Sequence, residues 1–196
     1  MILHLRSALV LFALLSVVTG IIYPIAVTGA AQVLFPAQAN GSLIEREGKL
    51  LGSVLIGQDF SGPEYFWPRP SATPGHSYNA FDAAELTGSS GTNLGPLSQA
   101  LVDAAGARVA ALRAADPRPA GPIPVDLVTA SASGLDPHLS LAAAYYQIPC
   151  VAQARGLSEA QVRSLVDQFT TGRLLGVLGE PRVNVLLLNL ALDGIQ

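Results

Sequence analysis

Four residues with the side chains of a hydrolase lie close together, within residues 131–138. Ser131 or Ser133 could act as a nucleophile, His138 as its base and Asp136 as the group that orients the base. The spacing argues against this chemistry, because triad members usually come from separate segments that face one another across a pocket. The chain also has no Gly-x-Ser-x-Gly motif. We therefore expect no catalytic residue, and interpret Asp136 as the cap of a helix that begins directly after it and breaks before Pro149.

A glycine- and serine-rich stretch, residues 88–95, precedes a predicted helix and could cradle an anion at the helix N-terminus. It lacks the Gly-Lys-Ser/Thr ending of a phosphate-binding loop, so we interpret it as a surface loop that could contact a partner or ligand. A metal site is not expected, because only His76 and His138 remain beyond the N-terminal segment and no Glu or Cys lies at ligand spacing. We expect neither a metal nor a firmly bound cofactor.

Aromatic residues gather in a proline-rich segment, where Tyr65, Phe66 and Trp67 precede Arg69. Packing into the core is one interpretation of these side chains. A protein-docking surface is the other, because aromatic residues and Arg dominate binding hot spots. The prolines forbid a helix over residues 61–77 and confine strands there to sheet edges.

The elements around these residues predict a mixed α/β fold with short strands, several helices and no internal repeat. Residues 41–58 are expected to form a hairpin with its turn at Glu47 and Gly48 and its return strand at residues 50–56. Apolar residues recur at helical spacing from 96 to 116, and a proline-dense linker follows over 117–124.

The last third of the chain carries clearer helix signals. Ser158 and Gln161 have the spacing of a capping box, which predicts a helix from Glu159 to about residue 170. Residues 183–192 are apolar nearly all round and could be a strand or a helix. Asn184 as a possible cap favours the helix.

The N-terminal region is long and apolar enough to cross a membrane. No charged side chain occurs between Arg6 and Glu45, and a bilayer core about 30 Å thick needs about 20 apolar helical residues. We expect residues 1–36 to form an anchor, with its span at about residues 8–30 and a kink near Pro24, and residues 37–196 to form one soluble domain. A cleaved signal peptide is the alternative, but its apolar region of about 7 to 15 residues is shorter than this one.

Charge indicates the orientation of the anchor and excludes some partners. Arg6 is the only firmly basic side chain near the span, so the positive-inside tendency predicts a cytoplasmic N-terminus and an extracytoplasmic domain. A net charge of −3 without runs of like charge argues against nucleic acid. Cys150 is the single cysteine, so an exported domain can hold no internal disulfide. The span contains no acidic, basic or histidine residue, so we expect that the chain cannot conduct an ion alone.

Several sequence blocks occur together in one order along the chain. They are Gly-Gln-Asp-Phe at 57–60, Tyr-Phe-Trp-Pro-Arg-Pro-Ser-Ala at 65–72, Tyr-Asn at 78–79, Ser-Gly-Thr-Asn-Leu-Gly-Pro at 90–96, Pro-Val-Asp-Leu-Val-Thr at 124–129, Ser-Gly-Leu-Asp-Pro-His at 133–138, Ala-Arg-Gly at 154–156 and Gly-Glu-Pro-Arg-Val-Asn-Val-Leu at 179–186. With one N-terminal span and one outer domain, this pattern resembles the C subunit of the Kdp potassium-transporting ATPase over essentially the whole chain.

The resemblance implies a non-catalytic accessory subunit of a bacterial inner-membrane pump, needed for its assembly and activity. The implied partners are a channel-like potassium-binding subunit, an ATP-hydrolysing P-type subunit and a small membrane peptide. The chain lacks the Asp-Lys-Thr-Gly-Thr phosphorylation motif, which agrees with a non-catalytic role. The family is also credited with raising the pump's affinity for ATP, which implies ATP as a ligand through the pump subunit. That role conflicts with direct contact by an extracytoplasmic domain, because ATP is cytoplasmic.

The chain departs from the family at one position, and two alternative functions stay open. The family usually has a basic residue, in the predicted helix break, where this chain has Cys150, which puts any ionic contact at that position in question. The alternatives are an anchored extracytoplasmic hydrolase using Ser133 or Ser131 with His138, and an anchored sensor or ligand-binding domain using residues 88–95. The candidate residues for partner contact are Tyr65, Phe66, Trp67, Arg69, Asn93, Gly95, Asp136, His138 and Gln147.

Overall fold

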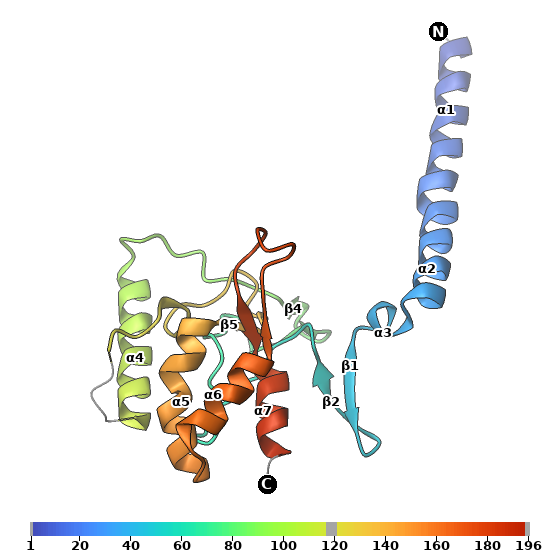
Figure 1. Ribbon diagram of the computed structural model, residues 1–196. Helices are drawn as coiled ribbons and strands as arrows, with labels where there is room; N and C mark the ends of the chain where they lie inside the picture. Colours follow the sequence, from blue (N-terminus) through green and yellow to red (C-terminus); the bar gives the residue numbers. More distant parts are fainter. Residues whose placement is uncertain (1, 117–120, 195–196) are drawn as a thin grey trace. The chain divides into compact units, whose positions relative to one another are not determined.

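The computed structural model describes residues 2–116 and 121–194, so that half of the predicted linker, residues 117–120, lies outside the described residues. The chain divides into two compact units, Met1–Ser53 and Val54–Gln196. The fold is of the mixed helix and sheet class that the sequence predicts (Figure 1).

The first unit begins with a long apolar helix. It consists of α1 (Ile2–Val17), a π-helical turn (Val18–Ile22) and α2 (Tyr23–Leu34). The stretch His4–Leu34 is 31 residues long, its most apolar 18-residue window has a mean hydropathy of 2.4, and none of that window is buried. At 1.5 Å per residue this exceeds the thickness of a bilayer core of about 30 Å. The helix is therefore a candidate membrane span.

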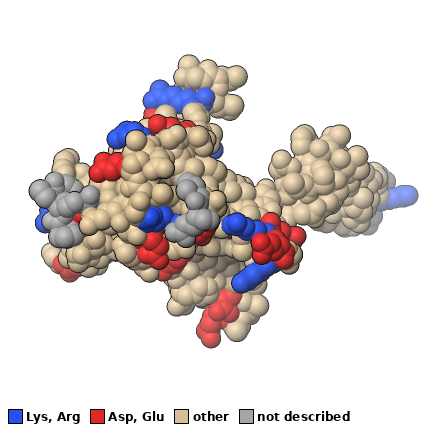
Figure 2. All heavy atoms as spheres, turned by 60° about the horizontal axis from the view of Figure 1, so that its bottom comes forward, with Lys and Arg blue, Asp and Glu red and all other residues tan. Residues whose placement is uncertain are grey.

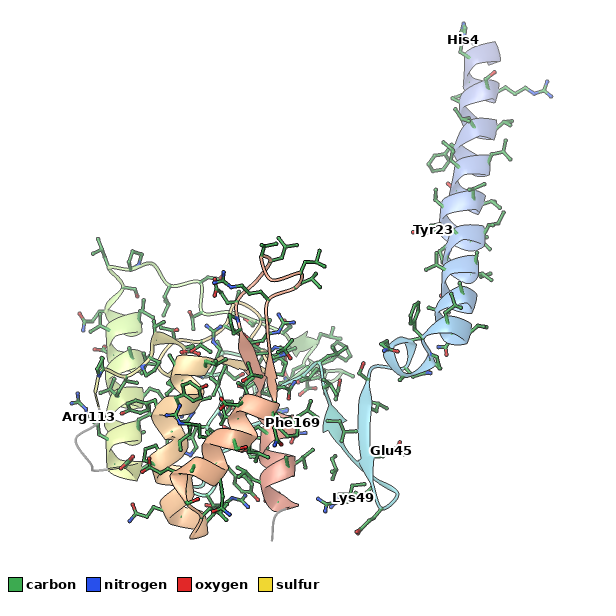
Figure 3. All side chains as sticks on the ribbon, in the orientation of Figure 1. His4, Tyr23, Glu45, Lys49, Arg113 and Phe169 are labelled. Atoms are coloured by element: carbon green, nitrogen blue, oxygen red, sulfur yellow. The ribbon has the colours of Figure 1, made fainter. Side chains whose placement is uncertain are left out.

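The surface of this helix fits a lipid environment. Side chains such as His4 and Tyr23 project from it without packing against other elements of the unit (Figure 3), and the basic colour on it is confined to one end (Figure 2). The sequence predicts a kink near Pro24. At that place the helix has the π-helical turn, in which Tyr23 N donates to Val18 O. Such a turn is a known accommodation of an irregularity in a helix.

A short helix and the predicted hairpin complete the first unit. After α3 (Pro36–Ala39), β1 (Leu43–Arg46) pairs antiparallel with β2 (Lys49–Ser53). The turn residues Glu47 and Gly48 both have positive φ, 55° and 75°, as a two-residue type I′ hairpin requires. The predicted turn is confirmed, whereas the return strand ends at Ser53 rather than near residue 56.

The second unit packs helices against a small antiparallel sheet with the order β5–β7–β6. Its strands are β5 (His138–Ser140), β6 (Thr170–Thr171) and β7 (Arg182–Asn184), and a separate hairpin pairs β3 (Phe81–Asp82) with β4 (Thr87–Gly88). The helices are α4 (Gln99–Ala115), α5 (Leu141–Arg155), α6 (Glu159–Gln168), α7 (Val185–Asp193) and the 3₁₀ turn Val125–Leu127.

Two C-terminal helices begin where the sequence predicts. Ser158 and Gln161 form both hydrogen bonds of the capping box that starts α6. The Asn184 side chain accepts from Leu187 N at 3.1 Å and starts α7, while Arg182–Asn184 is strand. The apolar run therefore contains the end of a strand and a capped helix.

The predicted helix after Asp136 is wrong at both ends. His138–Ser140 is extended because it pairs with β7, so α5 begins at Leu141, four residues later than predicted, and its cap is Ser140, whose Oγ accepts from Ala143 N at 3.1 Å. The helix also continues through Pro149 to Arg155. Proline removes one backbone donor from a helix, but the buried face of α5 provides packing that holds the helix together across it.

The core of this unit lies between the sheet, the helices and an irregular segment. Phe66, Leu127 and Val183 have no solvent exposure. Phe66 belongs to a stretch, residues 57–80, that contains no helix or strand. A segment without regular structure thus passes through the core, and its backbone polar groups need partners there.

Candidate functional site

Two buried side-chain amides hold the backbone of the aromatic segment. The Asn189 amide, on α7, accepts from Phe66 N at 2.9 Å and donates to Phe66 O at 3.0 Å. The Gln147 amide, on α5, accepts from Trp67 N at 2.7 Å and donates to Trp67 O at 3.2 Å. Each amide therefore supplies the pair of hydrogen bonds that a neighbouring strand would provide. Phe66, Trp67 and Gln147 are brought together, as structural partners.

Two arginines lie against the rings of the same segment. The guanidinium of Arg155 lies 4.9 Å from the ring centroid of Tyr65, and that of Arg108 lies 4.9 Å from the ring of Trp67. The Arg155 side chain is 3% exposed and pairs with Asp193 Oδ1 at 2.7 Å. Arg108 donates to two backbone carbonyls, and burial lowers its pKa. These contacts fasten the segment to α4, α5 and the end of α7.

Arg69, at the end of the segment, lines an open cleft of about 430 Å³ together with Asp136 and His138. Arg69 Nη1 lies 3.1 Å from Asp136 Oδ2. Asp136 Oδ1 accepts from His138 N at 3.0 Å and lies 3.5 Å from His138 Nδ1. Asp136 is therefore the ion-pair partner of Arg69 and accepts a hydrogen bond from the backbone of His138 in a local turn. It is not a helix cap.

Neither Asp136 nor Tyr78 has the pKa of a general base. Burial alone would raise the pKa of Asp136, but hydrogen bonds from His138 and the charge of Arg69 outweigh it and the net pKa lies below its ordinary value. Burial, with Asp136 nearby, raises the pKa of Tyr78, whose hydroxyl donates to Arg69 O at 2.7 Å. At pH 7 the carboxylate is charged and the phenol neutral, whereas a general base has a pKa near the working pH.

The serines that suggest a hydrolase form hydrogen bonds within their own turn. Ser131 Oγ accepts from Gly134 N at 2.9 Å, and Ser133 Oγ accepts from Leu135 N at 3.2 Å. Within residues 2–116 and 121–194, no hydrogen bond joins either serine to His138. The arrangement lacks the contact between nucleophile and base on which a triad depends.

The glycine-rich loop packs against that serine turn. Ser90 N donates to Ser133 O at 2.9 Å, and a Cβ at Gly91 would come within 2.5 Å of Ala132 O. Close backbone packing therefore requires this glycine. Asn93 and Gly95 lie exposed further along the loop, away from the aromatic segment in sequence and in hydrogen bonding, and their role as partner contacts stays a prediction.

Cys150 lies within α5, which is continuous where the sequence predicts a break, and it packs against the C-terminal end of α4. Its Sγ is 3.7 Å from Ala115 O and 3.9 Å from Pro63 O. It lines a cavity of about 20 Å³ with Tyr65 and Trp67 among others, which is room for about one water. The thiol is thus a small packing group at this position.

Sequence reasoning missed Arg108, Arg155, Asn189 and Asp193 as members of this network. For two of them, the sequence contains a feature that could have indicated their role. Asn189 is the one amide in the buried stretch of α7, and a buried amide needs hydrogen-bond partners. Arg108 falls on the apolar face of α4, three residues after Ala105 and four before Leu112.

Over the part of the chain that the structure describes, the fold and the candidate site define a protein with one candidate membrane span and one mixed α/β unit, in which most of the predicted site residues support the fold. Within the described residues, no group of three or more His, Cys, Asp or Glu side chains could hold a metal ion. A family model described as "KdpC: K+-transporting ATPase, c chain" matches residues 5–194. The chain therefore belongs to the KdpC family.

Relatives from several bacteria match along nearly their whole length. The chain is 58% identical over 196 residues to the potassium-transporting ATPase KdpC subunit of Sorangium cellulosum, covering 100% of both chains. It is 61% identical over 192 residues to the subunit of that name from Polaromonas naphthalenivorans, covering 98% of this chain and 95% of the relative. The subunit of Methylococcus capsulatus is 57% identical, again covering 100% of both chains. The family resemblance predicted from the sequence is confirmed.

Proposed function

We propose that this chain is a non-catalytic accessory subunit of a potassium-transporting ATPase in a bacterial inner membrane. The observation that carries the proposal is the family match over residues 5–194. The site agrees with it, because the charged and aromatic side chains are engaged in holding the domain together. The proposed partners are a channel-like potassium-binding subunit, an ATP-hydrolysing P-type subunit and a small membrane peptide.

In this proposal residues 1–36 form the anchor, with a cytoplasmic N-terminus, and residues 37–196 form the extracytoplasmic domain. The candidate span His4–Leu34 and the basic Arg6 near its start support this orientation. An effect of the subunit on the affinity of the pump for ATP would then pass through the span, because the nucleotide is on the other side of the membrane.

Purification tests the assembly. The full chain is solubilised in detergent with a C-terminal affinity tag, and the co-purifying proteins are identified by mass spectrometry. We expect the other subunits of the pump in the eluate. A chain purified from potassium-starved cells without any pump subunit would refute the proposal.

Cysteine labelling tests the orientation. In a Cys150→Ser background, Ala84→Cys places a thiol at an exposed position of the domain, and His4→Cys places one at the other end of the span. A membrane-impermeant maleimide on spheroplasts should label residue 84 at once and residue 4 only after lysis. The reverse pattern would place the domain in the cytoplasm.

A further inference from the structure

The connection between β6 and β7 carries an exposed apolar tip, residues 174–178. In Figure 1 this hairpin rises away from the helices of the unit. Its four large aliphatic side chains are solvent-exposed over more than half of their surface: Leu174 67%, Leu175 85%, Val177 73% and Leu178 58%. Isolated exposed apolar residues are normal on a protein surface, but a contiguous group on a protruding turn is typical of an interaction site.

The backbone of the apolar tip is also strained, at Leu175. Leu175 has a φ of +53°, a conformation in which bulky side chains are unfavourable and Gly, Asn or Asp is usual. The turn keeps it there, because Leu174 and Leu178 exchange hydrogen bonds in both directions, at 2.8 and 3.0 Å. Solvent exposure and backbone strain both disfavour leucine at this position, and the three further exposed aliphatic side chains beside it distinguish it from an isolated exposed leucine.

The surroundings of the apolar tip decide what kind of partner fits it. At its base Arg173 and Glu180 form an ion pair, in which Arg173 Nη2 lies 3.0 and 2.7 Å from the two carboxylate oxygens, so this pair carries no net charge. A lipid headgroup layer is usually met by Trp, Tyr and unpaired basic residues. Residues 173–180 contain no Trp or Tyr and no basic residue other than the paired Arg173, and the chain carries a net charge of −3.

We propose that the apolar tip docks into an uncharged, apolar recess on another protein subunit of the potassium-transporting ATPase. The tip supplies aliphatic side chains on a turn held by backbone hydrogen bonds, and the Arg173–Glu180 pair forms the polar rim beside them. This inference rests on the proposed function and adds the surface through which the domain meets its complex.

The test compares two leucines with the same backbone conformation. Leu175→Asn replaces the docking side chain with a residue that tolerates positive φ. Leu86→Asn makes the same change at a leucine with φ +52° and 79% exposure in another turn, away from any such cluster. Binding of each purified full-length chain to the pump prepared without this subunit is measured in detergent, where no bilayer is present.

We expect Leu175→Asn to bind about ten- to a hundredfold more weakly, the range set by burying one leucine side chain, with thermal stability equal to or above that of the wild type. Leu86→Asn should bind like the wild type. Equal binding by all three chains would overturn the docking role and leave the accessory-subunit proposal standing, whereas a wild-type chain that does not bind would overturn both. A photo-crosslinking residue at Val177 should capture a pump subunit in native membranes, and adducts with lipid alone would assign the tip to the bilayer instead.

Discussion

Asn189→Ala should destabilise the domain more than the same change at Gln147 or at an exposed amide. The Asn189 side chain is 1% exposed and makes both of its hydrogen bonds to the backbone of Phe66, whose side chain has no exposure. Alanine removes both partners at once. Water cannot replace them without opening the core, so a backbone donor and a backbone acceptor are left unsatisfied.

The magnitude follows from the number of groups left without partners. Each buried polar group that loses its partner costs about 1 to 3 kcal/mol, so two such groups cost about 2 to 6 kcal/mol. Gln147→Ala should cost less, because the backbone of Trp67 that it serves is only partly buried. With a urea m-value of about 2 kcal/mol/M, the midpoint for Asn189→Ala should fall by roughly 1 to 3 M.

The assay uses the single tryptophan of the chain, Trp67, as its probe. Its fluorescence reports on the segment that the two amides hold, in the full chain in detergent micelles titrated with urea. Gln153→Ala is the matched control, since Gln153 is an exposed amide on α5. We expect the loss of stability to rank Asn189→Ala above Gln147→Ala, and both above a control near zero.

An Asn189→Ala midpoint equal to that of the Gln153→Ala control would refute this reasoning. Such a result would mean that the backbone of Phe66 finds other partners at no cost. Asn189→Asp gives a second check, because the carboxylate keeps an acceptor for Phe66 N but faces Phe66 O without a donor. It should be at least as destabilising as alanine at pH 7.

Two further predictions concern the start of α5 and the ion pair beside it. Asp136→Asn removes a carboxylate whose folded pKa lies below its unfolded value of about 3.9, so the stability that the charge contributes is present above pH 4 and lost below. In urea titrations the wild type should have a larger free energy of unfolding than the variant at pH 7, and the difference should shrink as the pH falls below 4. Ser140→Ala should cost about 0.5 to 2 kcal/mol through loss of the cap, whereas Ser98→Ala, at a helix start without a side-chain cap bond, should be close to neutral. Equal losses at the two serines would contradict the capping assignment.

Several features could be predicted because their determinants are close together in the sequence. The capping box of Ser158 and Gln161, the turn at Glu47 and Gly48, and the cap at Asn184 each depend on residues within three positions of one another. The apolar helix His4–Leu34 depends on composition alone. Local hydrogen bonds and transfer into lipid are decided within the segment, so the segment itself reveals them.

The start of α5 and the candidate site required the tertiary structure. Residues 138–140 are strand because β7, more than 40 residues later in the chain, pairs with them, and the signals at Asp136 and Pro149 give no sign of that partner. The amides that hold Phe66 and Trp67 lie 123 and 80 residues away in sequence. Their roles follow from burial, since an irregular segment in the core must find partners for its backbone wherever the fold brings a donor and an acceptor together.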